Sequence, residues 1–290
     1  MQLPFALARR FVAGPTLESA LPALDPLLDD GLFITLDLLG EHVHDRTKAQ
    51  GFADAYGDLV ERLATYRDAR GVAPEAVGIS IKLSMIGQVI DRDTCERNLR
   101  DLLARAKEAD LFVRLDMEGT DITQSTLDFF EAVYPDFPDH VGPVLQAYLL
   151  RTAADVARMC ELDARVRLCK GAYKEPASLA HQDMPTIRWH YRQHAQALLT
   201  GARYPGIATH DDELIAAVRQ LADERGVARD AFEFQMLYGL RPETQRQMVQ
   251  DGYRMRVYVP YGTEWLPYFS RRIRERKENA FFVLKALVQG

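Results

Sequence analysis

The chain has 290 residues, of which 47% are hydrophobic, enough for one large core or two modest ones. Its net charge of −6 argues against nucleic acid as the main partner, because a phosphate backbone requires a basic protein face. No run of about 18 apolar residues occurs, so no transmembrane helix is expected. Three cysteines, Cys95, Cys160 and Cys169, form no CxxC pair and favour a reducing, intracellular compartment.

The first 30 residues are predicted to form a short helical segment ahead of a single domain that spans residues 31–290. In the opening stretch MQLPFALARRFVAG, the arginines Arg9 and Arg10 follow the apolar residues instead of preceding them. A secretory signal has the reverse order. We therefore interpret this stretch as the first turns of a helix.

Eight short runs rich in β-branched and aromatic residues alternate with longer stretches of helical character. Several runs are almost continuously apolar, as is typical of parallel strands covered on both faces. The predicted strands are LFITLD (32–37), VGISIKL (77–83), LFVRLDM (111–117), GPVLQAY (142–148), RVRLCKG (165–171), GIATH (206–210), FEFQMLY (232–238) and YRMRVYV (253–259).

Helix start and stop signals lie between these runs. Asp93 stands in the cap position of the capping box DTCE, which predicts a helix from this point through Lys107. Asp211 or Asp212 is expected to cap another helix, and Gly226 is expected to end it. Each of these helices follows a predicted strand, which is the arrangement of a βα unit.

The repeated strand–helix units predict an α/β fold. A helix over residues 153–162 fills the gap between the fourth and fifth strands, and the segment after Gly262 supplies the eighth helix. Eight such units fit a (β/α)₈ barrel of the TIM type. A doubly wound sheet is the alternative, but no GxGxxG follows any strand, so its main signature is absent.

Polar side chains gather where the predicted strands end, which is the end of such a barrel that carries active sites. Lys82 and Lys170 lie at the ends of apolar strands, and a buried lysine costs free energy unless it has a partner. An ion pair with Asp116 would give Lys82 a purely structural role, and that alternative stays open. The other polar or distinctive residues at these ends are Asp37, Asp116, Met117, Glu118, Gln146, Tyr148, Arg167, Tyr173, Thr209, His210, Gln235, Leu237 and Tyr258.

Metal and nucleotide motifs have little support. His42 with His44, or His190 with His194, lacks the third ligand that a catalytic zinc site needs. The sequence HYRQH lacks the glutamate of HExxH, and there is no Walker A sequence and no GxSxG elbow. No metal is therefore predicted.

Two other enzyme classes remain open from the residues alone. Asp37, Asp116 and Glu118 could form a carboxylate pair for sugar hydrolysis, although that reaction leaves the lysines unexplained. A Schiff-base aldolase could use Lys82 or Lys170 if its pKa were lowered. A colourless protein trapped by borohydride with a carbonyl compound would favour the aldolase.

The segment YFSRRIRE near the C-terminus has the features of a carboxylate clamp. On a helix, Tyr268, Arg271, Arg272 and Glu275 are three or four residues apart and share a face. The helix is expected to begin near Pro267 or the residue before it, because proline fits only the first turn. Arginine suits a carboxylate because its planar fork donates two parallel hydrogen bonds. A helix across the barrel mouth would shield these bonds from water.

The strand ends, taken together in chain order, resemble the proline dehydrogenase family over nearly the whole chain. The resemblance is carried by LDLLGE, ISIKLS, RLDME, VLQAY, RLCKGAY, ATH, FQMLYG and YVPYG, followed by YFSRRIRE. It is specific because eight short motifs and the paired arginines occur in the right order. It implies a monofunctional bacterial enzyme with a distorted (β/α)₈ barrel and its last helix over the barrel mouth. It also implies oxidation of L-proline to Δ1-pyrroline-5-carboxylate by hydride transfer to N5 of FAD.

The resemblance implies a role for each matching residue on the substrate side. Asp116 would order the lysine and the site around it. Glu275 would pair with the arginines. The carboxylate of proline would be bound by Lys82, Arg271 and Arg272. Its ring would be packed by Leu237, Tyr258 and Tyr268.

On the flavin side, the resemblance places Arg167 near N5 of the isoalloxazine, where it and Asp116 would be the catalytic residues. The isoalloxazine ring would be lined by Met117, Gln146 and Gln235. The rest of the cofactor would be bound by Lys170, Gly171, Ala172, Tyr173, Thr209 and His210.

Partners and location are also implied by the resemblance. Relatives pass electrons to a membrane quinone, so a quinone acceptor and a peripheral contact with the inner face of the cell membrane are expected of a cytoplasmic protein. A non-enzymatic alternative is that residues 271–277 form a basic patch for a membrane surface or nucleic acid.

Overall fold

The computed structural model describes residue 5 and residues 8–275, and for residues 271–275 it describes the backbone only. Within this part of the chain, eight parallel strands close into a barrel in sequence order, β1 to β8. All eight predicted strands are confirmed, with ends that shift by no more than two residues. The strands are β1 (Phe33–Leu38), β2 (Val77–Ile81), β3 (Phe112–Leu115), β4 (Val141–Gln146), β5 (Arg167–Cys169), β6 (Gly206–Ala208), β7 (Glu233–Leu237) and β8 (Arg254–Tyr261).

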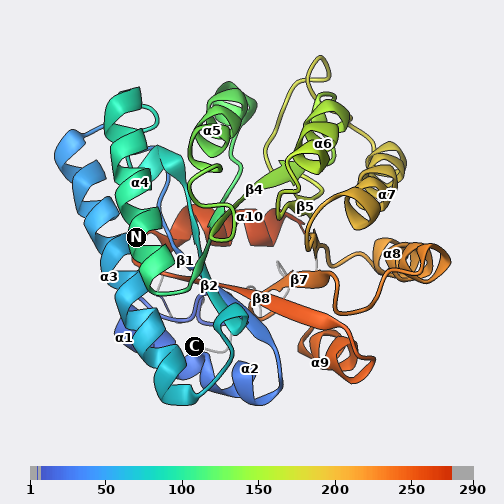
Figure 1. Cartoon of the computed structure of the whole chain (residues 1–290), viewed down its shortest axis with the longest axis horizontal. Coiled ribbons are helices and arrows are strands. Elements are labelled where there is room, and N and C mark those ends of the chain that lie inside the picture. The colour runs from blue at the N-terminus through green and yellow to red at the C-terminus, as the bar shows by residue number, and fades with distance from the viewer. Residues whose placement is uncertain (1–4, 6–7, 276–290) are drawn as a thin grey trace, which may run out of the picture.

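A ring of helices surrounds the barrel (Figure 1). The long helices follow the strands alternately, as a (β/α)₈ fold requires. The predicted fold class is therefore confirmed. The ring consists of α3 (Arg46–Arg70), α4 (Arg92–Glu108), α5 (Thr120–Val133), α6 (Thr152–Glu161), α7 (Met184–Gly201), α8 (Asp212–Arg225) and α9 (Pro242–Gln250).

Two short N-terminal helices, α1 (Leu17–Ala20) and α2 (Asp25–Asp29), complete the ring between α9 and α3 (Figure 1). Tyr66 of α3 donates to Asp25 at 2.6 Å, and Arg246 of α9 pairs with Asp30 at 2.7 Å. Residues 8–11 form a turn instead of the expected helix, whereas residues 1–4, 6 and 7 of the opening stretch lie outside the described residues. Because α1 and α2 occupy the eighth position in the ring of helices, the last helix does not pack there.

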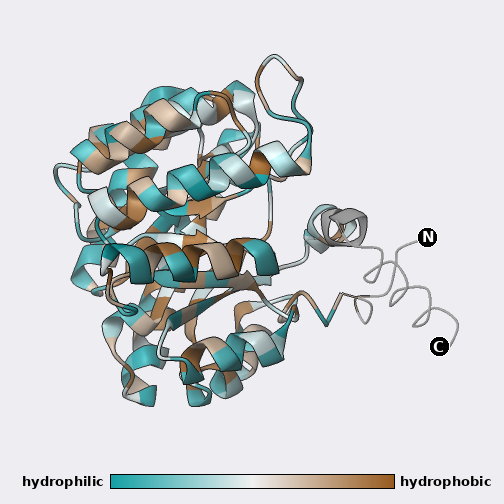
Figure 2. Cartoon of the chain, turned by 90° about the vertical axis from the view of Figure 1, so that its right-hand side faces the viewer, coloured by the Kyte–Doolittle hydropathy of each residue, from teal (hydrophilic) through white to brown (hydrophobic). Residues whose placement is uncertain are grey.

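The last helix, α10 (Trp265–Glu275), lies at one end of the barrel instead of beside it (Figure 2). Tyr268 and Phe269 pack against Leu39, which follows β1, and Leu240, which follows β7. These contacts put α10 at the carboxyl ends of the strands, which we call the upper end of the barrel. Gly262 turns the chain from β8 toward α10 with φ of 127°, a value that L side chains rarely adopt. The predicted position of this helix over the mouth is confirmed.

One predicted helix cap is wrong and one is confirmed. The N-cap of α4 is Asp91, which accepts from the N–H groups of Asp93 and Thr94, so Asp93 lies inside the helix. Both residues are aspartates, and only the extended backbone at Asp91 distinguishes the true cap. Asp211 caps α8, and Gly226 ends it in the left-handed conformation, as predicted.

The hydrophobic core lies between the barrel and the helices. Along β1, Ile34 and Leu36 join this core, whereas Thr35 borders a cavity inside the barrel. Successive side chains of a strand point to opposite faces, so Asp37 continues the inward row. The helices carry hydrophilic and hydrophobic residues mixed along their length, as expected of helices that cover a core with one face (Figure 2). The interior of the barrel, which we call the lumen, is thus left to polar groups, whereas branched apolar side chains usually fill it.

Candidate active site

Asp116, directly after β3, is held by two side chains from across the lumen. Its Oδ1 accepts from Nη1 of Arg167 at 2.7 Å, and its Oδ2 accepts from the hydroxyl of Tyr258 at 2.7 Å. Nη1 of Arg167 also donates to Ser80 at 3.1 Å. The Arg167 guanidinium lies over the Tyr258 ring, 5.2 Å from its centre. Three predicted site residues therefore form one network, in which Arg167 is buried and Asp116 and Tyr258 are half-buried.

Lys82 is paired with Asp37, which lies near the end of β1. Its Nζ lies 3.0 Å from Oδ1 and 3.3 Å from Oδ2 of that carboxylate. An ammonium has three N–H donors, so at least one remains available to a ligand. The ion pair with Asp116, left open by the sequence, is not formed, because the direct partner of Lys82 is Asp37 and both oxygens of Asp116 are bonded elsewhere. Asp116 still acts on Lys82 through its charge.

The pKa values of this pair follow from burial and mutual attraction. Burial raises the pKa of Asp37, Lys82 opposes the rise, and Asp116 adds to it. Burial alone would lower the pKa of Lys82, but the carboxylates of Asp37 and Asp116 outweigh it and raise that pKa. A Schiff-base lysine needs the opposite shift. Lys170 is ion-paired with Asp211 at 3.1 Å, so neither lysine suits an aldolase.

The carboxylates do not suit sugar hydrolysis. Asp37 is bound to Lys82, and Asp116 is bound to Arg167 and Tyr258. Glu118 is buried and accepts a hydrogen bond from Ser84 at 2.9 Å. Burial raises the pKa of Glu118. No two of them form the matched acid and base that flank a glycosidic bond.

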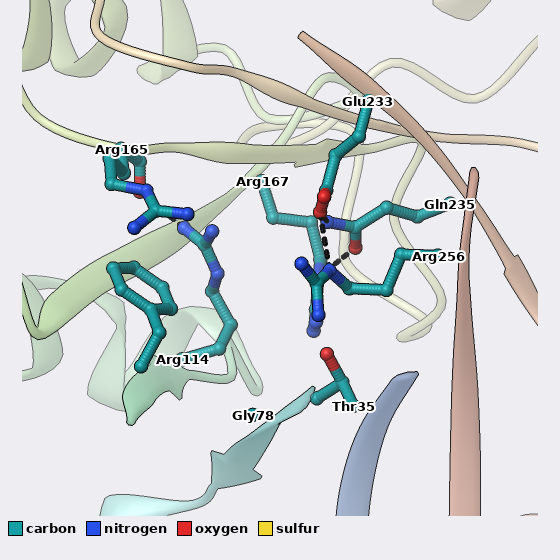
Figure 3. A pocket seen from close by; sticks show the side chains of 9 residues that line it. Thr35, Gly78, Arg114, Arg165, Arg167, Glu233, Gln235 and Arg256 are labelled. Atoms are coloured by element: carbon teal, nitrogen blue, oxygen red, sulfur yellow. Dashed lines mark hydrogen bonds and ion pairs between the residues drawn. The ribbon is translucent and has the colours of Figure 1, made fainter. Parts of the chain in front are cut away.

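The network continues from Arg167 down the lumen (Figure 3). Nε of Arg167 donates to Oε1 of Gln235 at 2.5 Å, and the amide of Gln235 donates to Glu233. Glu233 in turn pairs with Arg256 at 2.7 Å. Gln235 therefore has both of its polar ends bonded, which fixes the side chain that was predicted to border the isoalloxazine.

The predicted flavin residues border the upper ends of β3 to β7. Gln146 is buried and donates to the carbonyl of Glu118 at 2.9 Å, beside the buried Met117. Thr209 accepts from the N–H of Asp211 at 3.1 Å, and His210 accepts from the N–H of Leu237 at 2.9 Å. These residues are all held in place by contacts with the scaffold.

The loop after β5 carries Gly171, Ala172 and Tyr173. Gly171 has φ of 118°, and a Cβ there would lie 2.2 Å from the ring of Tyr148. The hydroxyl of Tyr148 donates to the carbonyl of Tyr173 at 3.2 Å, which ties the loop to the end of β4. A glycine is therefore required for the loop to pass this close to Tyr148.

Two residues of the site were not predicted in their observed roles. The sequence suggests Asp37 only as a carboxylate for sugar hydrolysis. Its contact with Lys82 depends on the reach of the two side chains near the ends of β1 and β2, for which the sequence has no signal. Arg188 of α7 donates to Asp211 at 2.8 Å, on the same carboxylate oxygen as Lys170. It lies inside a helix, so no strand-end pattern could have identified it.

A cleft of about 640 Å³ separates α10 from the loop after β1. Tyr268 lines it, and Leu237 packs against the same apolar cluster as Tyr268. Arg271, Arg272 and Glu275 lie on the next turns of α10, and their side chains are outside the described residues. The lining residues are Leu39, Gly40, Glu41, His42, Val43, His44, Asp45, Lys48, Phe52, Glu264, Pro267 and Tyr268.

Among the described residues, no group of three or more histidine, cysteine, aspartate or glutamate side chains is arranged to hold a metal ion. His190 stacks on His181 with ring centres 4.0 Å apart, so their faces and not their nitrogens meet. No helix in the described part of the chain is both long and apolar enough to cross a membrane.

Comparisons with known proteins agree with this geometry. Residues 20–285 match the family model described as proline dehydrogenase. A proline dehydrogenase of Deinococcus radiodurans is 42% identical over 98% of this chain and 91% of its own. Proline dehydrogenase 1 of Bacillus subtilis is 40% identical over 97% and 91%.

A solved structure is similar as well. Proline utilization A from Bdellovibrio bacteriovorus, inactivated by N-propargylglycine, superposes with a TM-score of 0.87 at 27% identity. The match covers 93% of this chain but only 32% of that protein, so this chain corresponds to about a third of it. The family resemblance drawn from the strand-end motifs is confirmed.

Proposed function

The chain belongs to the proline dehydrogenase family, and we propose that it oxidises L-proline to Δ1-pyrroline-5-carboxylate at the upper end of the barrel, with FAD as its flavin. Family membership assigns the enzyme class, the first step of proline catabolism and a flavin cofactor. The observation that carries the site assignment is the network of Asp116, Arg167 and Tyr258 beside the Lys82–Asp37 pair, under α10.

The residues around the upper end fit a flavin. Arg167, Gln146 and Gln235 offer fixed polar groups on one side of the lumen. Gly171 leaves backbone where a side chain would collide with Tyr148, so a ligand can approach the loop closely. Lys170 and Arg188 add positive charge for the phosphates, although both already bond Asp211. A flavin bound here supplies the hydride acceptor.

Thr209 and His210, with Ala172 and Tyr173, are proposed to hold the ribityl and adenine portions. Met117 is proposed to border the ring. His210 would act through its fixed orientation, since it already accepts from the N–H of Leu237. The fit rests on the position of these residues at the ends of β3, β5 and β6 and on the hydrogen bonds of Thr209 and His210 to the backbone.

The protein's own contribution is to bind and orient proline. The free N–H of Lys82 can bind one oxygen of the substrate carboxylate. Arg271 and Arg272 are proposed to complete the clamp from α10, with Glu275 paired to them, because helical spacing puts the three on one face. Tyr258, Leu237 and Tyr268 are proposed to pack on the ring. Such orientation holds the reacting carbon in place, and shielding by α10 strengthens each charged contact.

The amine of proline must be neutral when its C–H bond breaks, because the nitrogen lone pair forms the C=N bond. A secondary ammonium is mostly protonated at neutral pH. The value of kcat/KM for proline is therefore expected to rise toward alkaline pH, and a flat profile across the neutral range would contradict this mechanism.

The direct test is anaerobic mixing of the purified protein with L-proline. A yellow protein whose visible flavin absorbance bleaches on mixing supports the proposal. Release of the flavin by heat, followed by chromatography against FAD and FMN standards, tests the identity of the cofactor. A protein that binds no flavin, or a flavin that L-proline leaves oxidised, would refute it.

The clamp is tested with Arg271→Met. Without Arg271, the carboxylate of bound proline would lack one of its partners, which is expected to cost about 2–5 kcal/mol of binding. This loss would appear as a large rise in KM for proline while flavin content stays unchanged. Arg158→Met is a suitable control, because that arginine pairs with Glu131 on the outer surface. Unchanged proline kinetics in Arg271→Met would refute the clamp.

The acceptor and location are further parts of the proposal. A quinone is proposed to take the electrons, and a peripheral contact with the inner face of the membrane is proposed to bring it near. Trp189 on α7 is 57% exposed, and tryptophan favours the membrane interface. Vesicle sedimentation with wild type and Trp189→Ser tests the contact, and equal pelleting of the two would contradict this surface.

A further inference from the structure

The lower end of the lumen, where the strands begin, is crowded with arginines (Figure 3). A small cavity there is bordered by side chains of six strands or the residues just before them. Arg114 and Arg256 are 4% and 7% exposed, and Arg165 is partly buried. The cavity is lined by Thr35, Gly78, Phe112, Arg114, Arg165, Arg167, Glu233, Gln235 and Arg256.

The positive charges at this end exceed the negative ones. Glu233 is the carboxylate of the cavity lining, and it pairs with Arg256. Arg167 is matched by Asp116 above it. Among the described residues, neither Arg114 nor Arg165 forms an ion pair with a carboxylate. The charge of Glu233 acts on both arginines but is already paired with Arg256, so these two guanidinium groups have no carboxylate of their own.

The contacts that these two arginines do make are neutral. Nη1 of Arg114 donates to the carbonyl of Pro143 at 3.1 Å and to that of Arg165. Arg165 lies over the ring of Phe112 at 4.1 Å and that of Tyr204 at 5.0 Å. Its buried Nε has no hydrogen-bond partner among the protein atoms described. Carbonyls and rings offset part of the cost of burying a charge, but less than an anion does.

At this level of the barrel, two positions of the wall, Gly142 and Gly206, are glycines and carry no side chain. A Cβ on Gly142 would lie 2.7 Å from Nη1 of Arg114, and a Cβ on Gly206 would lie 2.4 Å from the amide of Gln235. Glycines therefore make room for the polar side chains that cross the lumen. What remains is a cavity of about 10 Å³, which holds one particle of roughly the size of a water molecule.

We propose that this cavity is a binding site for a monatomic anion, a halide of the chloride type, held between Arg114, Arg165 and Arg256. The charge of the lining selects an anion over neutral water. The small volume selects a monatomic ion over phosphate, sulfate or a carboxylate. The three arginines proposed to hold the ion lie toward the beginnings of the strands, away from the proposed proline site, and only Arg167 and Gln235 of the cavity lining also belong to that site.

The anion has a structural purpose in this arrangement. Burial and the neighbouring Arg167 and Arg165 charges push the pKa of Arg114 well below its ordinary value. An anion in the cavity removes the repulsion among the guanidinium groups. It thereby stabilises the lower half of the barrel on which the network around Arg167 rests.

The first experiment locates the ion. Crystals of the wild-type protein are grown with sodium bromide, and anomalous differences are measured at the bromine edge. The expected result is a peak in the cavity in contact with the guanidinium groups of Arg114 and Arg165. Water density in the cavity without an anomalous peak, in crystals where bromide is found elsewhere, would overturn the proposal.

The second experiment measures stability at constant ionic strength and neutral pH, with sodium chloride against sodium gluconate. Chloride at about ten times its dissociation constant is expected to raise the Tm of the wild type by about 3 °C relative to gluconate. General salt effects act in the other direction, since more strongly hydrated anions stabilise proteins by exclusion. A Tm that is equal or lower in chloride would overturn the proposal.

Arg165→Met identifies the site in the same assay. This change leaves no carboxylate without its ion-pair partner, and methionine packs well on the rings of Phe112 and Tyr204. The chloride response is expected to disappear in Arg165→Met and to persist in Arg203→Met, which removes a surface arginine that pairs with Asp139. A full chloride response in Arg165→Met would overturn the site. If that variant does not fold, the bromide map of the wild type decides.

Discussion

At the upper end of the lumen, Lys82 and Arg167 each face a carboxylate, whereas at the lower end Arg114 and Arg165 face carbonyls and aromatic rings. Both ends are buried, so both have to offset the cost of removing charge from water. At the upper end, directed bonds of 2.7–3.0 Å offset it and fix each side chain in one orientation. At the lower end, weaker neutral contacts leave a cationic cavity.

The difference follows from what each end does. A substrate must meet donors that already point at it, because orientation made in advance costs nothing at the moment of reaction. Paired carboxylates provide that orientation for Lys82, Arg167 and Tyr258. The lower end has no substrate to orient, so its arginines act as a scaffold. Glu233, which accepts from both Arg256 and Gln235, is the link between the two ends.

The largest effect is expected from Asp116→Asn, which removes the counter-charge of Arg167 without changing the shape of the side chain. A buried cation left unpaired costs about 3–5 kcal/mol of folding free energy. The value of kcat/KM for proline is expected to fall at least a hundredfold, because Arg167 and Tyr258 both lose their orientation. Urea unfolding and steady-state kinetics measure the two effects.

Asp139→Asn is the matched control, since Asp139 also pairs with an arginine, Arg203, but is largely exposed. The loss of that surface pair is expected to change stability by no more than about 1 kcal/mol and to leave the kinetics unchanged. Equal losses of stability in the two variants would mean that the upper end is no more strongly paired than the surface.

Glu233→Gln is expected to have the next largest effect, and this effect depends on pH. Burial favours a raised pKa, but the Arg256 guanidinium outweighs it and lowers the pKa of Glu233 to about 2. The unfolded chain has the ordinary value near 4.5. A lowered pKa stabilises the fold fully above pH 4.5, and this contribution is lost as pH falls from 4.5 toward 2.

The size of this effect is on the order of 3 kcal/mol at neutral pH, from a pKa that falls by roughly two units or more. The stability gap between wild type and Glu233→Gln, measured by urea unfolding, is expected to be constant from pH 7 to 5. Below the ordinary pKa it should narrow by about 1.4 kcal/mol for each pH unit. A gap that stays constant down to the lowest pH at which the protein folds would contradict the ion pair.

The barrel could be predicted from sequence because each strand has a distinctive local pattern and each is followed by a helix. The alternation of apolar and polar residues within the strands also indicates which side chains point into the lumen, and the prediction did not use this signal. In RMRVYV of β8, Met255 and Val257 enter the apolar core while Arg256 and Tyr258 point into the lumen. The predicted strands were treated mainly as continuous apolar runs, so the polar lumen was not anticipated.

The pairing of side chains could not be predicted in the same way. Lys82 could reach either Asp37 or Asp116 from the end of β2, because each neighbouring strand has an aspartate within one residue of its end. Which one it contacts is decided by Arg167 and Tyr258, which occupy Asp116 from across the lumen. Such contacts depend on barrel closure, and residues 51 and 142 positions apart in the chain carry no local signal of them.

The smallest effect is expected from Tyr258→Phe, which removes one donor from Asp116 and leaves the aromatic ring and the Arg167 pair in place. A single hydrogen bond to a charged group contributes about 1.5 kcal/mol, so both stability and kcat/KM should fall by roughly that amount, or about tenfold in kcat/KM. Tyr66→Phe is the control, because its hydroxyl donates to Asp25 at 2.6 Å on the outer side of the barrel. It is expected to lose stability without losing activity. Should Tyr258→Phe lose stability alone in the same way, Asp116 would be a structural carboxylate, and the orientation of the upper end would rest on the Lys82–Asp37 pair instead.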